Sequence, residues 1–253
     1  MSEQVIEKRV EKGTEKATLK RQVWIARLTA VLFLISMYMV GRETAVYVTG
    51  RNVVNGEKAK HLVVIDAGHG GMDPGKIGIN DVAEKEINLS IALKVKKYLE
   101  FNDVKVVMTR ETDKGLNDPD ASNKQVQDMK RRLALIEETA PELAVSIHQN
   151  SYPEEYVHGA QVFYYGDSQK GKQAAELLQA QFVDKADPDN TRQIKPNDSY
   201  YLLKKTSVPI VIAECGFLSN QEEAEKLCSD AYQEKIAWAV TVGILQYLSA
   251  GQN

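Results

Sequence analysis

The sequence predicts a single α/β domain in which a mostly parallel, mixed sheet is flanked by helices. Short apolar runs rich in Val and Ile, such as residues 62–65 and 209–213, suit strands that are buried on both faces. Between these runs lie longer segments in which apolar residues recur at helical spacing. Strands and helices therefore alternate along the chain, an order that is typical of parallel sheets.

The first 60 residues differ from this domain. Residues 1–21 are charged and contain few large apolar side chains, so we expect them to be disordered. Residues 22–41 include a 14-residue apolar run, Leu28 to Gly41, that follows four basic residues. This layout is typical of a signal peptide or a signal-anchor helix with its basic flank in the cytoplasm. No convincing Ala-x-Ala cleavage site follows, so we favour an uncleaved anchor over a cleaved and released form.

The rest of the chain is then expected to lie outside the cytoplasm, tethered to a membrane. Residues 42–60 read as a linker, and residues 61–250 as the folded domain. The first 60 residues carry 11 Lys and Arg against 6 Asp and Glu, whereas the remainder carries 21 against 29. Because the domain is acidic and has no nucleic-acid-binding motif, we expect no nucleic-acid partner.

Each element of the domain is predicted from its own pattern. Ile87, Ile91, Val95 and Leu99 recur every four residues and give the first helix one apolar face. Asp, Pro and Asn in residues 118–123 predict a turn, and residues 186–199 predict a long polar loop. In chain order, we expect strands at 62–65, 105–108, 144–147, 160–165 and 209–213, and helices at 84–99, 123–138, 169–183 and 230–248.

Chemically active side chains follow several of the predicted strands. His69 lies in the glycine-rich loop after the first strand, and His148 and Glu214 directly follow the third and fifth strands. The carboxyl ends of parallel strands meet at one edge of a sheet, where α/β proteins bind ligands. Glu84 begins the first helix. Two histidines and a carboxylate are a zinc set that leaves a coordination position for water, and the second carboxylate is then free to act as a base.

Each residue also has an ordinary structural explanation. A single histidine after a strand is more often a hydrogen-bonded structural residue than a ligand, and an acid at a helix start is favoured by the dipole. Glu214 is harder to explain in this way, because an unpaired charge on a buried strand is costly. Asp66 either accepts a hydrogen bond from a ligand histidine or stabilises its loop. Candidates for substrate contact, or for ordinary turn positions, are Asn150, Asn220 and Lys195, whereas His61 and His158 are expected at the surface or a strand edge.

The two cysteines, Cys215 and Cys228, are too few for a disulfide framework and lack the paired spacing of a thiolate zinc site. We expect two small buried thiols. A disulfide between them is the alternative if the domain lies outside the cytosol.

Four motifs follow one another in the domain: VVIDAGHGGMDPG, EKEINL, SIHQNS and ECGFLSN. In this order they resemble the zinc-dependent N-acetylmuramoyl-L-alanine amidases of bacterial cell walls, the amidase type 3 family. The resemblance covers residues 61–250 and implies an α/β fold with Zn²⁺ as cofactor. It also implies that His69, Glu84 and His148 bind the zinc and that Glu214 is the catalytic carboxylate.

The resemblance further implies hydrolysis of the amide between N-acetylmuramic acid and L-alanine in peptidoglycan. Arg132, or its neighbour Arg131, matches a family position where arginine precedes an apolar helical run, near the substrate or behind the zinc ligands. A catalytic domain behind one hydrophobic segment, without wall-binding repeats, is most similar to the germination-specific branch that acts on spore cortex. That branch implies a route to muramic lactam, a muramic acid deacetylase that acts next, and an accessory activator protein.

Several alternatives stay open. The glycine-rich loop could cradle phosphate in a nucleotide-binding domain, but it lacks GxGxxG and GxxxxGK[ST] and leaves Glu84, His148 and Glu214 without roles. The domain could bind cell wall without catalysis. A zinc peptidase acting on the stem peptide could use the same groups, and a vegetative amidase that separates daughter cells would have the same chemistry on a different schedule.

Overall fold

The structure is a computed structural model. It describes residues 61–251 together with residues 24, 28, 29, 31, 33 and 36. The chain divides into two units, residues 1–58 and 59–253. The predicted disordered tail, signal anchor and linker over residues 1–60 therefore fall almost entirely outside the described residues. Among the residues that are described, no helix is long and apolar enough to cross a membrane.

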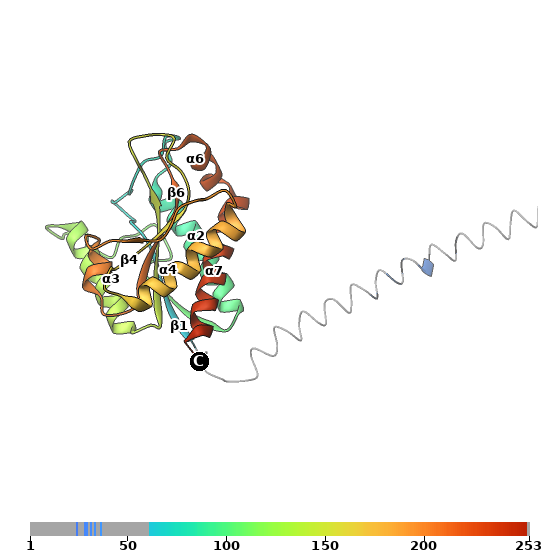
Figure 1. Ribbon diagram of the computed structural model, residues 1–253, viewed down its shortest axis with the longest axis horizontal. Helices are drawn as coiled ribbons and strands as arrows, with labels where there is room; N and C mark the ends of the chain where they lie inside the picture. The colour runs from blue at the N-terminus through green and yellow to red at the C-terminus, as the bar shows by residue number, and fades with distance from the viewer. Residues whose placement is uncertain are drawn as a thin grey trace, which may run out of the picture. The chain divides into compact units, whose positions relative to one another are not determined.

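A six-stranded sheet forms the centre of the second unit (Figure 1). Its strands are β1 (His61–Ala67), β2 (Val104–Met108), β3 (Leu143–Asn150), β4 (Gln161–Tyr164), β5 (Lys195–Pro196) and β6 (Ile210–Phe217). Their order in the sheet is β2-β1-β3-β6-β4-β5. β2, β1, β3 and β6 are parallel, whereas β4 runs antiparallel to β6. The prediction of an α/β domain with a mixed, mostly parallel sheet is confirmed.

Helices cover both faces of the sheet (Figure 1). α2, α4 and α7 pack together on one face, and α3 and the short α5 contact each other on the opposite face. A π-helical turn, Phe182–Ala186, extends α4, and α6 packs against α7. The bounds are α2 (Glu84–Phe101), α3 (Lys124–Thr139), α4 (Gln169–Gln181), α5 (Tyr201–Lys205), α6 (Gln221–Cys228) and α7 (Asp230–Ala250).

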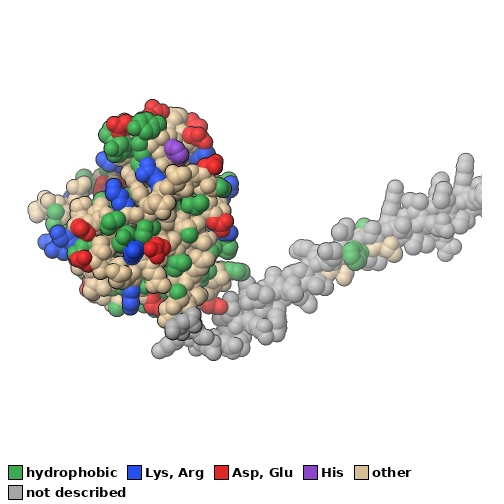
Figure 2. All heavy atoms as spheres, viewed as in Figure 1, with side chains coloured by type: hydrophobic (Ala, Val, Ile, Leu, Met, Phe, Trp, Pro, Cys, Tyr) green, Lys and Arg blue, Asp and Glu red, His purple; other side chains and the backbone are tan. Residues whose placement is uncertain are grey.

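Side-chain alternation along the strands divides the core into two. Val63 and Ile65 of β1 pack in the cluster that contains the buried residues of α2, α4 and α7. Val64, which lies between them, packs in the other cluster with Ile136 of α3. Successive side chains of a strand point to opposite faces, so an uninterrupted apolar run is required here. On the surface shown in Figure 2, acidic and basic side chains of this unit are interspersed.

Two groups of elements differ from the sequence prediction. β3 and β6 continue beyond their apolar runs, so His148 and Glu214 lie within strands and not directly after them. Pairing between β3 and β6 continues through these residues, which extends both strands. The sequence pattern also does not predict β5, α5 or α6, since elements of two, five and eight residues are too short to show a periodicity.

The cysteines match the prediction only in part. Cys215 is buried in β6, and burial raises the pKa of its thiol. Cys228 is exposed at the end of α6, so the prediction of a second buried thiol is wrong. Its sulfur accepts a hydrogen bond from Asn80 Nδ2 at 3.2 Å, and both thiols are free.

Candidate metal centre

The site forms where the carboxyl ends of three neighbouring parallel strands meet the start of a helix. His69 lies in the loop after β1, His148 lies in β3 and Glu214 lies in β6. The last two are register partners on adjacent strands. Glu84 is the first residue of α2. The fold therefore brings together the four residues that the sequence analysis singled out for chemistry.

His69, Glu84 and His148 form a cluster of two nitrogens and one carboxylate. His69 Nε2 lies 3.2 Å from Glu84 Oε2, and His148 Nδ1 lies 2.9 Å from Glu84 Oε1. The three ligand atoms lie within 4.8 Å of one another. Atoms bound at 2.0–2.2 Å around a tetrahedral zinc ion are about 3.4 Å apart. This donor set therefore fits such an ion with little rearrangement.

Glu84 is the centre of this cluster and is only 2% exposed. Its carboxylate accepts backbone hydrogen bonds from Lys76 and Gln149. Burial alone would raise the pKa of Glu84, but the two imidazoles outweigh it and hold the pKa well below its usual value. Burial likewise lowers the pKa of both histidines, but Glu84 outweighs it, raising the pKa of His148 and bringing that of His69 to about 9. The negative charge of Glu84 therefore favours positive charge on the two imidazoles.

The orientation of His69 is set by Asp73. His69 Nδ1 and Asp73 Oδ2 are hydrogen-bonded at 2.8 Å, which leaves Nε2 facing Glu84. A carboxylate on the far nitrogen of a histidine is the usual way of fixing a metal-binding imidazole. Gly75 has a φ of 69°, and an added Cβ there would collide with both Glu84 and His69. The loop therefore needs glycine at this position to pack against the cluster.

Glu214 stands beside the cluster without a hydrogen-bond partner for one of its oxygens. It is 6% exposed, and its Oε2 is buried and unpaired among the described residues. Burial raises the pKa of Glu214 to about 7, although the charge of His148 opposes the shift. A carboxyl group of this pKa can both accept and release a proton near neutral pH.

Asp66, the residue proposed from sequence to support a histidine, is bonded elsewhere. It is 1% exposed and accepts hydrogen bonds from Arg132 Nη1 at 2.5 Å and from the hydroxyls of Ser146 and Thr109. Burial opposes ionisation, but Arg132 and the two hydroxyls lower the pKa of Asp66 to about 2. Asp66 is therefore ionised, and the carboxylate that supports the His69 ring at Nδ1 is Asp73.

The structure also distinguishes the two adjacent arginines. Arg131 is exposed and pairs with Asp118, whereas Arg132 is 1% exposed and pairs with Asp66 and Asp128. Arg132 Nη2 also donates to the carbonyl of His69 at 2.6 Å. Arg132 therefore lies behind the loop of residues 68–83 that carries His69, the histidine loop, and its burial is incompatible with direct substrate contact.

A cavity of about 340 Å³ opens over the cluster. Its wall includes the two histidines, Glu84 and Glu214, and the proposed contact residue Asn150 also lines it. Tyr200 and Tyr201, at the start of α5, also line the cavity, and the backbone N–H of Tyr200 donates a hydrogen bond to Asn197 Oδ1. The candidate metal ligands are therefore accessible to a substrate.

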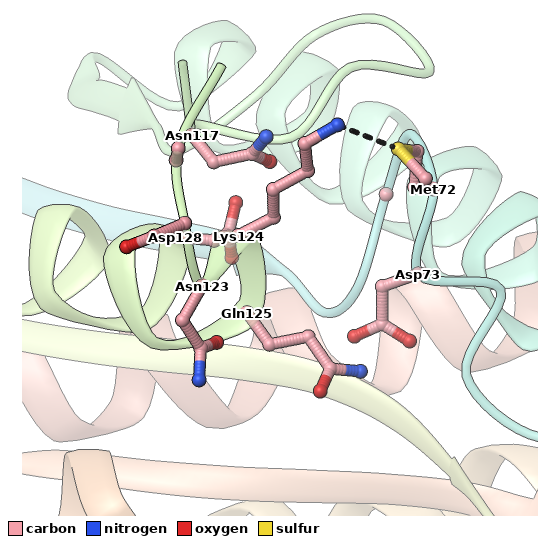
Figure 3. A pocket seen from close by; sticks show the side chains of 10 residues that line it. Met72, Asp73, Asn117, Asn123, Lys124, Gln125 and Asp128 are labelled. Carbon is pink, nitrogen blue, oxygen red and sulfur yellow. Dashed lines mark hydrogen bonds between the residues drawn. The ribbon is translucent and has the colours of Figure 1, made fainter. Parts of the chain in front are cut away.

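A second cavity, of about 440 Å³, adjoins the histidine loop through Gly70 and Asp73 (Figure 3). Its other wall is the start of α3, with Asn123, Lys124 and Gln125 (Figure 3). Lys124 extends across this space to Met72, whose sulfur lies 3.3 Å from the amine. This cavity therefore borders the same loop that carries His69.

The remaining sequence candidates lie elsewhere. His61 pairs with Glu142 at the start of β1, and His158 is exposed in a loop. Asn220 caps α6 by accepting a hydrogen bond from the backbone of Glu223, and Lys195 lies over the Phe163 ring. The lining of the 340 Å³ cavity contains none of these four residues.

Sequence reasoning missed Asp73 and Arg110. Asp73 lies four residues after His69 in the same glycine-rich loop, which is a usable signal. Arg110 comes two residues after the end of β2, next to β1 in the sheet, so strand-end position could also have indicated it. Arg110 is 5% exposed and donates to the carbonyls of Ala67 and Gly68.

An α/β domain that gathers two histidines and two carboxylates at one edge of its sheet has a donor set that could hold a metal ion, with a second carboxylate beside it, as hydrolases do. Comparison with known proteins defines the family. A family model described as N-acetylmuramoyl-L-alanine amidase matches residues 63–246. The chain belongs to this family, and it hydrolyses the N-acetylmuramoyl-L-alanine amide of peptidoglycan. The nucleotide-binding alternative is therefore wrong.

Individual relatives and solved structures to which the chain is similar are also N-acetylmuramoyl-L-alanine amidases or described as amidases. The germination-specific N-acetylmuramoyl-L-alanine amidase of Bacillus subtilis is 35% identical over 191 residues, which are 74% of this chain and 80% of the relative. The CwlD amidase from Clostridioides difficile, solved in complex with the GerS lipoprotein, is 39% identical with a TM-score of 0.74. That match covers 76% of this chain and 100% of CwlD. The amidase AmiC2 of Nostoc punctiforme is 32% identical with a TM-score of 0.67, over 75% of this chain and 98% of AmiC2.

Proposed function

We propose that this protein is a zinc-dependent amidase in which His69, Glu84 and His148 hold the metal and Glu214 transfers protons. The observation that carries the proposal is the buried, unpaired oxygen of Glu214 beside a cluster with zinc-ligand composition. Bound there, zinc would act as a Lewis acid toward the scissile carbonyl and lower the pKa of water toward about 7. The peptidoglycan amide is a poor electrophile, so both contributions are needed.

Glu214 would act as the base and then as the acid. With a pKa of about 7 it can accept the proton of the attacking water and pass it to the departing amine of L-alanine. Asp73 would hold the His69 ring, and Asn150 and Tyr200 would contact the substrate from the cavity wall. No cysteine takes part, because burial raises the pKa of Cys215 and Cys228 does not line the site.

Two substitutions test these roles. Glu214→Gln should bind zinc normally but lose about 10² to 10⁴ in turnover, since a general base contributes that much. His148→Ala should instead lose the metal, as elemental analysis of the purified protein would show. Full zinc content in His148→Ala, or near-normal turnover by Glu214→Gln, would contradict the assignment.

Mass spectrometry of digested peptidoglycan tests which bond is cut. The family activity predicts release of intact stem peptides from muramic acid. A zinc peptidase would instead shorten the stem and leave L-alanine on the sugar. Shortened stems, or the absence of any product, would contradict the family activity.

We further propose that the substrate is spore cortex, where amide hydrolysis frees the lactyl carboxyl that muramic lactam requires. The similarity to a germination-specific amidase supports this role. A muramic acid deacetylase would act next. Deleting the gene should abolish muramic lactam in purified spores. Unchanged lactam together with chained vegetative cells would instead indicate a cell-separation amidase.

We also propose that the protein is exported and that residues 22–41 anchor it in a membrane. We further propose that it binds an accessory activator protein. The basic flank and apolar run support export, and the solved complex of CwlD with a lipoprotein supports a partner. Fractionation should find the full chain in membranes, with its domain sensitive to external protease. A soluble cytosolic chain would contradict export, whereas a shortened, released chain would contradict only the tether.

A further inference from the structure

Arg110 is a buried cation to which the proposed chemistry gives no role. It follows β2 and is 5% exposed, yet within residues 61–251 no carboxylate lies within ion-pair distance of its guanidinium. Its hydrogen bonds go to backbone carbonyls. A charge buried without an opposite charge is costly unless hydrogen bonds compensate for lost water. The positions of the carbonyls that Arg110 contacts therefore indicate its structural role.

Three of these carbonyls lie next to candidate metal ligands. Arg110 Nε donates to Ala67 at 2.9 Å and Nη2 donates to Gly68 at 2.9 Å, the two residues before His69. Nη2 also donates to the carbonyl of Lys85 at 2.8 Å, the residue after Glu84. One rigid guanidinium thus joins the backbone segments that carry His69 and Glu84.

The same backbone also contacts the third ligand. A Cβ added to Gly68 would collide with the His148 ring. The carbonyl of Gly68 is held from a second side by Asn88 Nδ2 at 3.1 Å. The position of Gly68, which Arg110 and Asn88 fix, therefore determines the space available to His148.

His69 itself needs external support. Its φ of 62° lies in the left-handed region, which is unfavourable for an L-residue other than glycine. Such a conformation persists when surrounding contacts determine it. Arg132 holds the carbonyl of His69, and Arg110 holds the two preceding carbonyls, so the loop is fixed on both sides of the strained residue.

We propose that Arg110 is a positioning residue of the metal centre, which sets the distance between His69 and Glu84 before the metal binds. The inference rests on the proposed zinc function. Arg110 does not line the cavity over the ligands and so has no direct part in catalysis. Its loss should weaken the metal site through geometry, because a metal-ligand set must be held to within about 0.5 Å.

Zinc affinity measured by chelator competition tests this inference on the full-length chain. Arg110→Met keeps the apolar stem but removes every donor, and we expect zinc to bind 10- to 100-fold more weakly, a range typical for residues behind metal ligands. Arg110→Lys keeps the charge but cannot span three carbonyls, so it should fall between Arg110→Met and the unchanged protein. At saturating Co²⁺, the visible absorption of both variants should differ from that of the unchanged protein, because the ligand geometry has changed.

Arg131→Met is the matched control. Arg131 also donates to a backbone carbonyl, that of Leu116, and pairs with Asp118, but it is exposed and bonds to no residue of the histidine loop. It should retain normal zinc affinity and a normal cobalt spectrum. The control separates a general effect of losing an arginine from loss of the Arg110 contacts.

The outcomes are distinct. If Arg110→Met and Arg110→Lys melt at lower temperature but bind zinc as tightly as the unchanged protein, Arg110 is only structural and the inference is overturned. If Arg110→Met does not fold, Arg110→Lys decides alone. If the unchanged protein hydrolyses muropeptides without binding zinc, the proposed zinc function is wrong, and the role of Arg110 is wrong with it. This result comes from the unchanged protein, so it is distinct from any result obtained with the Arg110 variants.

Discussion

At the scale of single residues, the support of the histidine loop depends on buried charges. Asp66 and Arg132 form an ion pair whose side chains are 1% and 2% exposed. Removing one partner of such a pair leaves the other buried and uncompensated, which costs about 3 to 5 kcal/mol. Arg132 retains Asp128 as a second partner, so the cost of losing Asp66 should lie near the lower end of this range.

The pH dependence of stability gives a specific prediction for Asp66→Asn. The pKa of Asp66 is about 2 in the folded protein, below its ordinary value of 3.8, so ionised Asp66 stabilises the fold above pH 4. That contribution, about 2 kcal/mol, is lost as pH falls through 2. The free energy of unfolding, measured by urea in metal-free protein, should therefore differ most between Asp66→Asn and the unchanged chain at neutral pH.

The difference should shrink steadily below pH 4 and be smallest near pH 2. Asp118→Asn is the control, because Asp118 pairs with exposed Arg131 and should change stability little. A difference for Asp66→Asn that stays constant from pH 7 to pH 2 would show that Asp66 does not titrate in this range.

At the scale of elements, α4 and α7 approach each other at a glycine. A Cβ added to Gly243 of α7 would lie 2.9 Å from the Cα of Leu178 in α4, so the helices would have to separate. Alanine gains about 1 kcal/mol of helix propensity over glycine, but overpacking costs about 1 to 3 kcal/mol. We expect Gly243→Ala to lower the free energy of unfolding by about 1 kcal/mol.

Denaturant unfolding of Gly243→Ala measures this balance directly. Lys235→Ala, on the exposed side of the same helix, provides a matched control that changes propensity without packing. A Gly243→Ala protein more stable than the unchanged chain would mean that the helices separate at no cost.

The strands and helices also show which parts of the fold and the site could be predicted from the sequence. Apolar runs located β1, β3 and β6, and parallel pairing made their carboxyl ends converge, so His69, His148 and Glu214 could be grouped in advance. Sequence position could have indicated Arg110 and Asp73 as candidates, but their hydrogen-bond partners could not be predicted, because these depend on the path of the loop backbone. The extension of β3 and β6 through the site residues was hidden for a similar reason, since polar side chains end an apolar run before the strand ends.

For the molecule as a whole, we expect the hydrophobic core to fold without the proposed metal. The two hydrophobic clusters join strand residues to residues of the helices that cover the two faces of the sheet, and neither cluster contains a proposed metal ligand. Removing zinc with EDTA should abolish turnover but leave the far-ultraviolet circular dichroism spectrum unchanged. At a zinc concentration of 100 Kd, binding contributes about 2.7 kcal/mol, which corresponds to roughly 5 to 10 °C in Tm for a domain of this size.

Adding zinc back should restore both Tm and turnover. His69→Ala, which lacks a proposed ligand, should melt at the same temperature with and without EDTA. Loss of the folded spectrum on chelation would indicate instead that the metal is needed to build the domain.

The boundary between the two units gives the last prediction. The chain divides at residues 58 and 59, the family match begins at residue 63, and both hydrophobic clusters lie between residues 63 and 248. A fragment of residues 59–253 should therefore fold alone, with the same Tm, zinc affinity and turnover on soluble muropeptides as the full chain. The same fragment carrying Glu214→Gln should be inactive, which would assign the turnover to this site.

Sedimentation with membranes should be lost in the fragment and retained by the full chain, because residues 22–41 carry the proposed anchor. A fragment that is unfolded, or that binds zinc more weakly than the full chain, would show that residues 1–58 contribute to the catalytic domain.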